Sequence, residues 1–132
     1  MKYNDLTRKY FDSTPNAGEL EGIGVFRGAA GNLEQGTWVQ FDLQIQSGAV
    51  SAVRFLAFGC PHTIAVAAWL AEQAAGRPVA PQLPDSVQVL RDRFAVPVEK
   101  TGRLLIIEDA WLAAAAAAID YRENTHIHTV PD

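Results

Sequence analysis

The sequence predicts an α+β fold, in which a small antiparallel sheet of about three strands is covered on one face by helices. Hydrophobic and polar residues alternate between Thr37 and Phe58, a period of two that is typical of strands. After Cys60 the period becomes helical, and a run of alanines, Ala113–Ala118, lies in a second long helical segment. Because the strands and the helices are separated along the chain, we expect an antiparallel sheet rather than alternating βαβ units.

The composition is that of an ordinary globular chain. The 132 residues are 48% hydrophobic and 20% charged, a balance that excludes disordered and rod-like proteins. We expect one domain over residues 1–132, because chains of about 100–200 residues form a single core. The net charge of −4 and the lack of a dense basic stripe argue against nucleic-acid binding.

Membrane insertion and secretion are not expected. The longest apolar run, Ala110–Ile119, is far shorter than the roughly 20 residues of a membrane-spanning helix. The polar start of the chain does not resemble a signal peptide. A single cysteine excludes an intramolecular disulfide, so a reducing, cytoplasmic location is expected.

The first half of the chain should contain a helix and three strands. Asn4 is a suitable N-cap for a short helix, and residues 23–26 suit an edge strand. A half-buried strand should follow over residues 37–45, joined by a tight turn at Ser47-Gly48 to a strand ending at Phe58. The solvent-facing side of the first hairpin strand is expected to carry Trp38, Gln40, Asp42, Gln44 and Gln46.

Three helices should follow the sheet. Pro61 fits the first position of one helix and Gly76 its end, and Ser86 lies where a second helix begins. The last helix is expected from Arg103 to Arg122, and the tail over residues 124–132 should be loose.

Cys60 is the strongest candidate for chemistry. It follows a strand and occupies the N-cap position of a helix, where the helix dipole favours thiolate over thiol. His62, two residues further on, could join it as a metal ligand. The alternative is that Cys60 is a small buried hydrophobic residue, since free cysteines are among the most buried residue types. His126 and His128 are two further imidazoles that would complete a metal site if they approached Cys60.

The ordered motifs of the chain resemble a known family. The run Phe55–Cys60 followed by a small-residue helix is similar to the central motif of the U-type iron–sulfur cluster scaffolds, IscU and the N-terminal domain of NifU. Phe11, Asn16 and Gly18 match that family's N-terminal segment, and Glu108-Asp109-Ala110 resembles its Glu-Asp-Ala. Residues 96–100 are similar to the segment that the family offers to an Hsp70-type chaperone; they are Val96, Pro97, Val98, Glu99 and Lys100.

The resemblance implies an α+β scaffold for a [2Fe–2S] cluster, but most of the family's ligand positions have changed. Cys60 matches the middle of three cysteines. Gln35 and Thr37 stand where the first cysteine and an aspartate are expected, and Gly102 and Arg103 replace a histidine and the third cysteine. Since iron–sulfur clusters require thiolates or close substitutes, one chain should not hold a cluster in the family manner. Arg103 should bring a fixed positive charge to Cys60.

These observations leave three hypotheses for the function. The first is a non-enzymatic scaffold-like protein of iron–sulfur cluster assembly. In it, Cys60 accepts persulfide sulfur from a cysteine desulfurase, or shares a cluster or iron between the chains of a homodimer. The second is a docking module that contacts a chaperone through residues 96–100. The third is a thiol enzyme whose nucleophile is Cys60, activated by His62 and Arg103.

Overall fold

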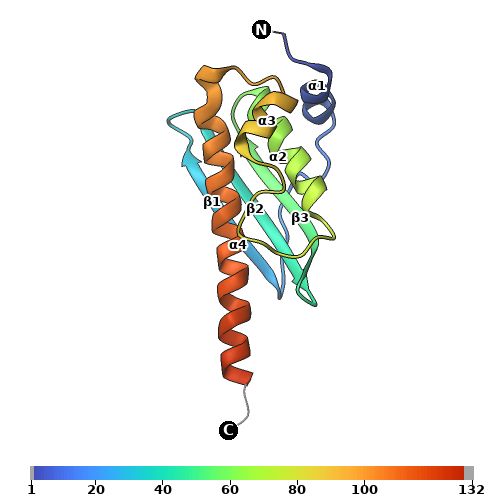
Figure 1. The fold of residues 1–132 in the computed structure, drawn as a ribbon, viewed down its shortest axis with the longest axis vertical. Helices are drawn as coiled ribbons and strands as arrows, with labels where there is room; N and C mark the ends of the chain where they lie inside the picture. The colour runs from blue at the N-terminus through green and yellow to red at the C-terminus, as the bar shows by residue number, and fades with distance from the viewer. Residues whose placement is uncertain (1, 130–132) are drawn as a thin grey trace.

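The computed structural model describes residues 2–129, with side chains described as far as residue 122. The elements in chain order are α1 (Asp5–Asp12), β1 (Val25–Asn32), β2 (Thr37–Gln46), β3 (Ala49–Phe58), α2 (Pro61–Ala74), α3 (Val87–Arg93), the 3-10 turn η1 (Val98–Lys100) and α4 (Thr101–Thr129). This order confirms the predicted α+β class (Figure 1).

The three strands form one antiparallel sheet in the order β1-β2-β3. The turn between β2 and β3 is the expected one: Ser47 and Gly48 both have positive φ, 53° and 79°, as a type I′ turn requires. The pairing places Trp38 opposite Phe58. The start of β2 and the end of β3 therefore lie at the same end of the sheet.

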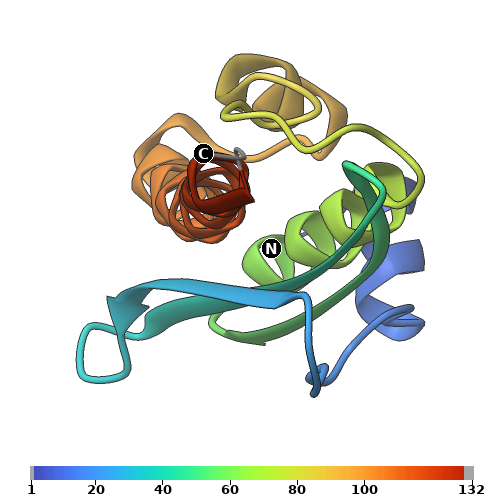
Figure 2. The same cartoon turned by 90° about the horizontal axis from the view of Figure 1, so that it is seen from below.

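The helices cover one face of the sheet (Figure 2). α2 and α4 both lie against this face, and α1 packs beside α2. Val39, Phe41 and Leu43 of β2 are fully buried beneath them. Trp111 of α4 packs edge-to-face on Phe41, with 5.3 Å between the ring centroids, so the core is fixed by a favourable aromatic pair.

The prediction placed the edge strand, over residues 23–26, too early in the chain. β1 begins at Val25 and continues through two glycines to Asn32, whereas Ile23 lies outside it and is 96% exposed. One of these glycines, Gly28, is needed because of the helix that packs on the strand. A Cβ atom there would collide with the backbone of Ala110 and Ala114, so Gly28 lets α4 lie directly on β1.

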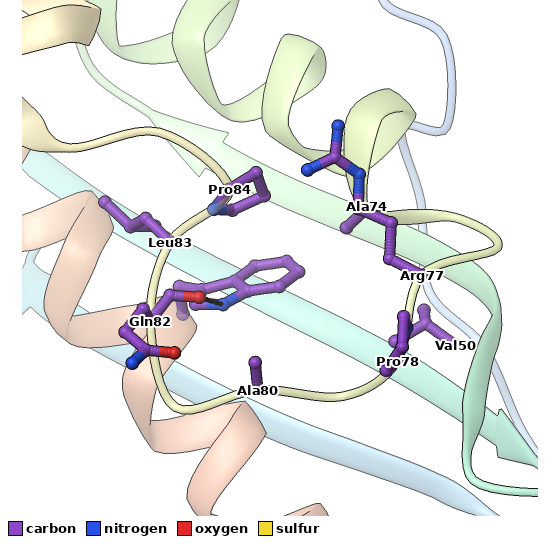
Figure 3. Close-up of a pocket in the computed structure, with 9 residues that line it drawn as sticks. Val50, Ala74, Arg77, Pro78, Ala80, Gln82, Leu83 and Pro84 are labelled. Atoms are coloured by element: carbon purple, nitrogen blue, oxygen red, sulfur yellow. Dashed lines mark hydrogen bonds between the residues drawn. The ribbon is translucent and has the colours of Figure 1, made fainter.

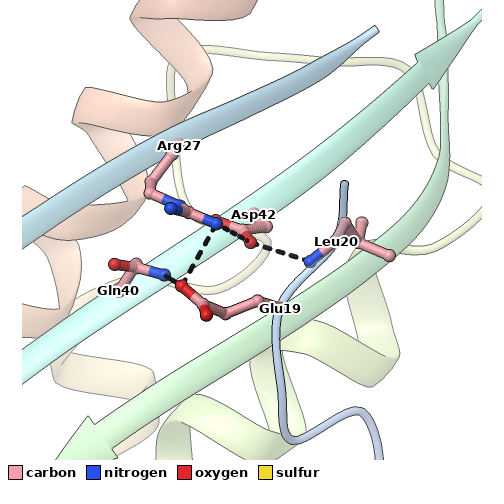
Figure 4. A network of polar contacts seen from close by, with 5 residues as sticks. All are labelled: Glu19, Leu20, Arg27, Gln40 and Asp42. Carbon is pink, nitrogen blue, oxygen red and sulfur yellow. Dashed lines mark hydrogen bonds and ion pairs between the residues drawn. The ribbon is translucent and has the colours of Figure 1, made fainter. Parts of the chain in front are cut away.

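The expected solvent-facing side of β2 is wrong for two of its residues. Gln40 is 8% exposed and Asp42 is fully buried, because the segment before β1 crosses this face of the sheet. Figure 4 shows the contacts that fasten it: Arg27 donates two hydrogen bonds to the Asp42 carboxylate, at 2.7 and 2.9 Å, and the Leu20 N–H donates a third at 2.9 Å. Glu19 joins this network through Arg27, at 3.2 Å, and through Gln40. Period-two alternation could not reveal a covering segment that lies elsewhere in the sequence.

The last helix is longer than expected at both ends. It begins at Thr101 and continues to Thr129, so the prediction of a loose tail is wrong for residues 124–129, and residues 130–132 lie outside the described part. Within the described residues, no helix is long and apolar enough to cross a membrane.

A proline-rich loop connects α2 to α3. Figure 3 shows it curving from Arg77 through Pro78, Ala80 and Gln82 to Pro84. It is attached to β3 by hydrogen bonds between Val50 and residues 76 and 77. The Trp111 indole N–H also donates to the Gln82 carbonyl, at 3.2 Å.

Candidate functional site

Cys60 lies at the corner between β3 and α2, as the N-cap residue of α2 with an extended backbone. Its Sγ is 3.6 Å from the Thr63 hydroxyl, one helical turn further on. Gly59 makes this corner possible, since a Cβ atom at that position would lie 3.0 Å from the Thr63 side chain. The thiol is half-buried, which leaves it within reach of a reagent from solvent.

The first turn of α4 brings a cation to the same thiol. The Arg103 guanidinium donates from Nη1 to Cys60 Sγ at 3.7 Å. The structure therefore places Arg103 beside Cys60, where the sequence led us to expect it.

The surroundings of Cys60 favour the thiolate. Burial raises the pKa of the thiol, but four groups outweigh it: the backbone N–H of Thr63, the hydroxyl of Thr63, the backbone N–H of His62, and the charge of Arg103. The two N–H groups make no capping hydrogen bond to Sγ and act as the positive end of the helix dipole. The net effect is a pKa below the usual value.

His62 lies apart from the thiol. Residues two apart on a helix do not face each other, and the His62 ring packs edge-on against Tyr3, with 4.7 Å between centroids. His62 is 1% exposed, and neither of its ring nitrogens has a hydrogen-bond partner among the described residues. Burial, and then the charges of Lys100 and Arg103, lower its pKa, so the ring is neutral at neutral pH.

Gln35 and Thr37 lie at the same end of the sheet as Cys60, but the structure shows no contact between either side chain and the thiol. Thr37 is buried and begins β2, one position before the pair Trp38–Phe58. Gln35 is exposed in the turn between β1 and β2, where its N–H donates to the Asn32 side chain. Gly102 precedes Arg103 in the first turn of α4 and has open space around its Cα.

His126 and His128 do not approach Cys60. Both belong to the last turns of α4 rather than to an extended tail, and their side chains lie outside the described part. A helix rises about 1.5 Å per residue, so their backbone lies more than about 30 Å along α4 from Arg103, which contacts the thiol. The hypothesis that they complete a metal site with Cys60 of the same chain is therefore wrong.

The segment over residues 96–100 lies next to this site. Val96 is buried, whereas Val98, in η1, is 71% exposed. Pro97 precedes η1, and Glu99 and Lys100 complete it directly before α4. Lys100 Nζ lies 6.0 Å from the centre of the Tyr3 ring, so this segment meets the start of the chain beside the ring that packs on His62.

The donor set at Cys60 does not fit a [2Fe–2S] cluster within one chain. Within residues 2–122, no group of three or more His, Cys, Asp and Glu side chains is placed to hold a metal ion. The neighbours of Cys60 Sγ are a hydroxyl and a guanidinium. A guanidinium is no ligand, and its fixed charge repels a metal cation.

Two residues of the site were missed by the sequence analysis. Thr63 contacts the thiol and Tyr3 covers His62. The spacing between Cys60 and Thr63 is a usable signal, because side chains three apart on a helix are neighbours. Nothing local in the sequence points to Tyr3, which lies just before the N-cap of α1, far from His62 in the sequence.

The structure is an α+β domain with a cysteine at the start of the helix that follows the sheet, and comparison with known proteins identifies its family. The family model described as "NifU-like N terminal domain" matches residues 2–127. This chain therefore belongs to the NifU-like N-terminal domain family, the scaffold family of iron–sulfur cluster assembly.

Relatives of known sequence or structure include three of note. A nitrogen fixation protein NifU from Cereibacter sphaeroides is 40% identical over 78 residues, which are 54% of this chain and 31% of that protein. The chain thus spans about a third of that relative. A protein described as an iron–sulfur cluster assembly scaffold for the SUF system, from Fervidobacterium islandicum AW-1, has a TM-score of 0.64 at 17% identity and covers 88% of this chain and 96% of its own. A NifU-like N-terminal protein from Brucella abortus has a TM-score of 0.54 at 13% identity, with 94% of each chain covered. The two structures support the fold.

Proposed function

We propose that this protein takes part in iron–sulfur cluster assembly by accepting sulfur on Cys60, without holding a cluster within one chain. The observation that carries this proposal is the pair of neighbours of the thiol. Arg103 and Thr63 stabilise a thiolate, and neither is a ligand for iron. Such a site suits a nucleophile better than a metal centre.

The reaction is a sulfur transfer from a donor persulfide. The Cys60 thiolate attacks the terminal sulfur of the donor and forms a new S–S bond, while the S–S bond of the donor breaks. The electron pair leaves on the donor cysteine as its thiolate. The sulfur keeps its oxidation state in the transfer, so no external oxidant or reductant is needed.

The proposed donor is a cysteine desulfurase, the sulfur source that the family resemblance implies. In this role Cys60 is a stoichiometric acceptor and the protein is not an enzyme. The reaction requires a free thiol at Cys60, which suits a reducing compartment such as the cytoplasm.

The direct test is single-turnover transfer from a persulfide donor under anaerobic conditions, followed by intact-protein mass spectrometry. We expect wild-type protein to gain the mass of one sulfur atom and Cys60→Ala to gain none. Thr7→Ser, a conservative change in α1 away from the thiol, is the matched control and should behave as wild type. No gain by the folded wild-type protein would overturn the proposal.

A second candidate function is docking of an Hsp70-type chaperone on residues 96–100. It is favoured by the exposure of Val98, a large apolar side chain in a short turn beside Cys60. The expectation is that Val98→Glu abolishes chaperone binding while Cys60→Ala leaves it intact. Equal binding by wild-type protein and Val98→Glu would exclude this contact.

A further inference from the structure

A pocket lies on the side of the molecule where α2 ends, away from the thiol. Its volume is about 310 Å³. Cys60 precedes the first residue of α2 and Ala74, which lines the pocket, is the last. At about 1.5 Å per residue, roughly 20 Å of helix separates the pocket from Cys60, so the two sites are independent.

The pocket is pre-formed by rigid elements. Trp111 is held by its hydrogen bond to the Gln82 carbonyl and by its contact with Phe41. The loop over residues 76–84 contains three prolines, which restrict its backbone. Its start is attached to β3 by Gly76 N–H to Val50 carbonyl, at 2.7 Å, and by Val50 N–H to Arg77 carbonyl, at 2.8 Å. These contacts hold the loop against β3 and α4, so the cavity is already formed without a ligand.

The lining is mostly apolar, with one polar residue, Gln82, and one cation, Arg77. The apolar lining comes from β3, the end of α2, the loop and α4: Val50, Ala74, Pro78, Ala80, Leu83, Pro84 and Trp111. Arg77 supplies the charge, and no carboxylate is among the lining residues. Figure 3 shows the Arg77 side chain leaving the loop beside Pro78 and passing Ala74, so that its guanidinium lies at the outer rim of the pocket, on the side of α2.

The Arg77 guanidinium has no carboxylate partner among the described residues. It differs in this from Arg27, which is paired with Asp42, and from Arg93, which is paired with Asp85 at 3.1 Å. An unpaired guanidinium beside an apolar cavity complements a molecule with an apolar body and an anionic end.

We infer that this pocket binds a small apolar carboxylate, with its hydrocarbon part over Trp111 and its carboxylate at Arg77. A volume of about 310 Å³ lies at the small end of the range of ligand pockets, roughly 300–1,000 Å³, so the ligand is a small molecule. This binding is separate from sulfur transfer and needs no contribution from Cys60.

The probe is octanoate, a small apolar carboxylate, and 1-octanol is its uncharged counterpart. Binding is followed on the full chain by two-dimensional NMR, in the Trp111 indole N–H signal and the backbone amides of residues 76–84. We expect saturable shifts confined to these signals, and octanoate binding about three- to fivefold tighter than 1-octanol, the gain of one exposed ion pair.

Two variants separate the hydrocarbon contact from the charge. Arg77→Gln should keep 1-octanol binding and remove the preference for octanoate, whereas Arg8→Gln, an exposed arginine of α1, should preserve that preference. Ala80→Phe should fill the cavity and weaken both ligands. The inference is overturned by unsaturable or scattered shifts in the wild-type protein, or by an unchanged octanoate preference in Arg77→Gln. Either result would leave the sulfur-transfer proposal untouched, because that proposal depends on Cys60.

Discussion

Arg103 Nη1 lies 3.7 Å from Cys60 Sγ, although the two residues are 43 apart in the sequence. The contact joins the first turn of α4 to the N-cap of α2. It places a permanent positive charge where a thiolate would form, and this helps to lower the pKa of Cys60 despite the burial that raises it. The contact connects the fold to the proposed sulfur chemistry.

Removing this charge should raise the pKa of the Cys60 thiol. In Arg103→Gln the remaining groups around Sγ are unchanged, so the thiolate loses one source of stabilisation. The pH profile of alkylation by iodoacetamide should therefore move to higher pH, with a several-fold slower reaction at neutral pH. Arg103→Lys keeps the charge and should retain most of the effect. Identical profiles for wild-type protein and Arg103→Gln would show that the guanidinium does not act on the thiol.

A methyl group at Gly59 should destabilise the fold. A Cβ atom there would lie 3.0 Å from both Cβ and Oγ1 of the fully buried Thr63, so Gly59→Ala should cost about 1–3 kcal/mol of stability. Urea unfolding measures this cost. The double variant Gly59→Ala/Thr63→Ala removes the crowded side chain, so its loss of stability should be smaller than the sum of the two single losses.

Gly102→Ala is the matched control for that experiment. Position 102 has open space and lies in a helix, where alanine is preferred to glycine by up to about 1 kcal/mol. This variant should be as stable as the wild type or more so. A Gly59→Ala variant as stable as the wild-type protein would disprove the close contact.

The buried carboxylate of Asp42 should be needed to hold the segment before β1 on the sheet. Asp42→Asn leaves Arg27 and the Leu20 N–H with a poorer acceptor, so we expect a loss of about 2 kcal/mol at pH 7. Chemical denaturation at pH 7 gives the value, with Asp12→Asn on the exposed face of α1 as the control. No loss of stability would mean that the network does not fasten this segment.

The Asp42 carboxylate should also make the free energy of unfolding decrease at acid pH. Burial raises the pKa of Asp42, but the hydrogen bonds from Arg27 and Leu20 outweigh it and the pKa is lowered. Its contribution is thus complete above the unfolded value of about 3.9 and is lost as the pH falls through the lower folded value. Asp42→Asn should flatten that part of the stability curve.

His62 should weaken the fold in mild acid. Its pKa is lowered by burial and by Lys100 and Arg103, so below an unfolded pKa of about 6.5 the unfolded chain takes up a proton that the native state resists. Stability should therefore fall as the pH drops from 7 toward 5. His62→Leu should reduce this slope in urea denaturation, whereas His126→Gln should leave it unchanged. An equal slope in His62→Leu would contradict the buried, unpartnered imidazole.

Local patterns predicted the elements well. The cap at Asn4, the start of a helix at Ser86 and the start of α2 at Pro61 follow from local chemistry and are confirmed. The turn at Ser47-Gly48 is confirmed as well. These features depend on a few neighbouring residues, which is why they can be recognised in a single sequence.

The sequence could not predict contacts that depend on tertiary structure. Burial of Asp42 requires a segment about twenty residues earlier to cross the sheet, and the continuation of β1 through Gly28 requires α4 to lie on it. At the site, the match to the family's motifs predicted that Arg103 lies near Cys60. The motifs gave no signal for the contact of Tyr3 with His62 or for the place of Arg77 at the pocket.

The most direct test of a sulfur-accepting site is the iron and sulfide content after anaerobic reconstitution, measured beside persulfide labelling of the same preparation and of Cys60→Ala. We predict that wild-type protein acquires one persulfide sulfur at Cys60 and no stoichiometric iron, and that Cys60→Ala acquires neither. Stoichiometric iron and sulfide that disappear in Cys60→Ala would contradict this prediction. A ratio of one cluster per two chains would then identify Cys60 as a ligand shared in a homodimer.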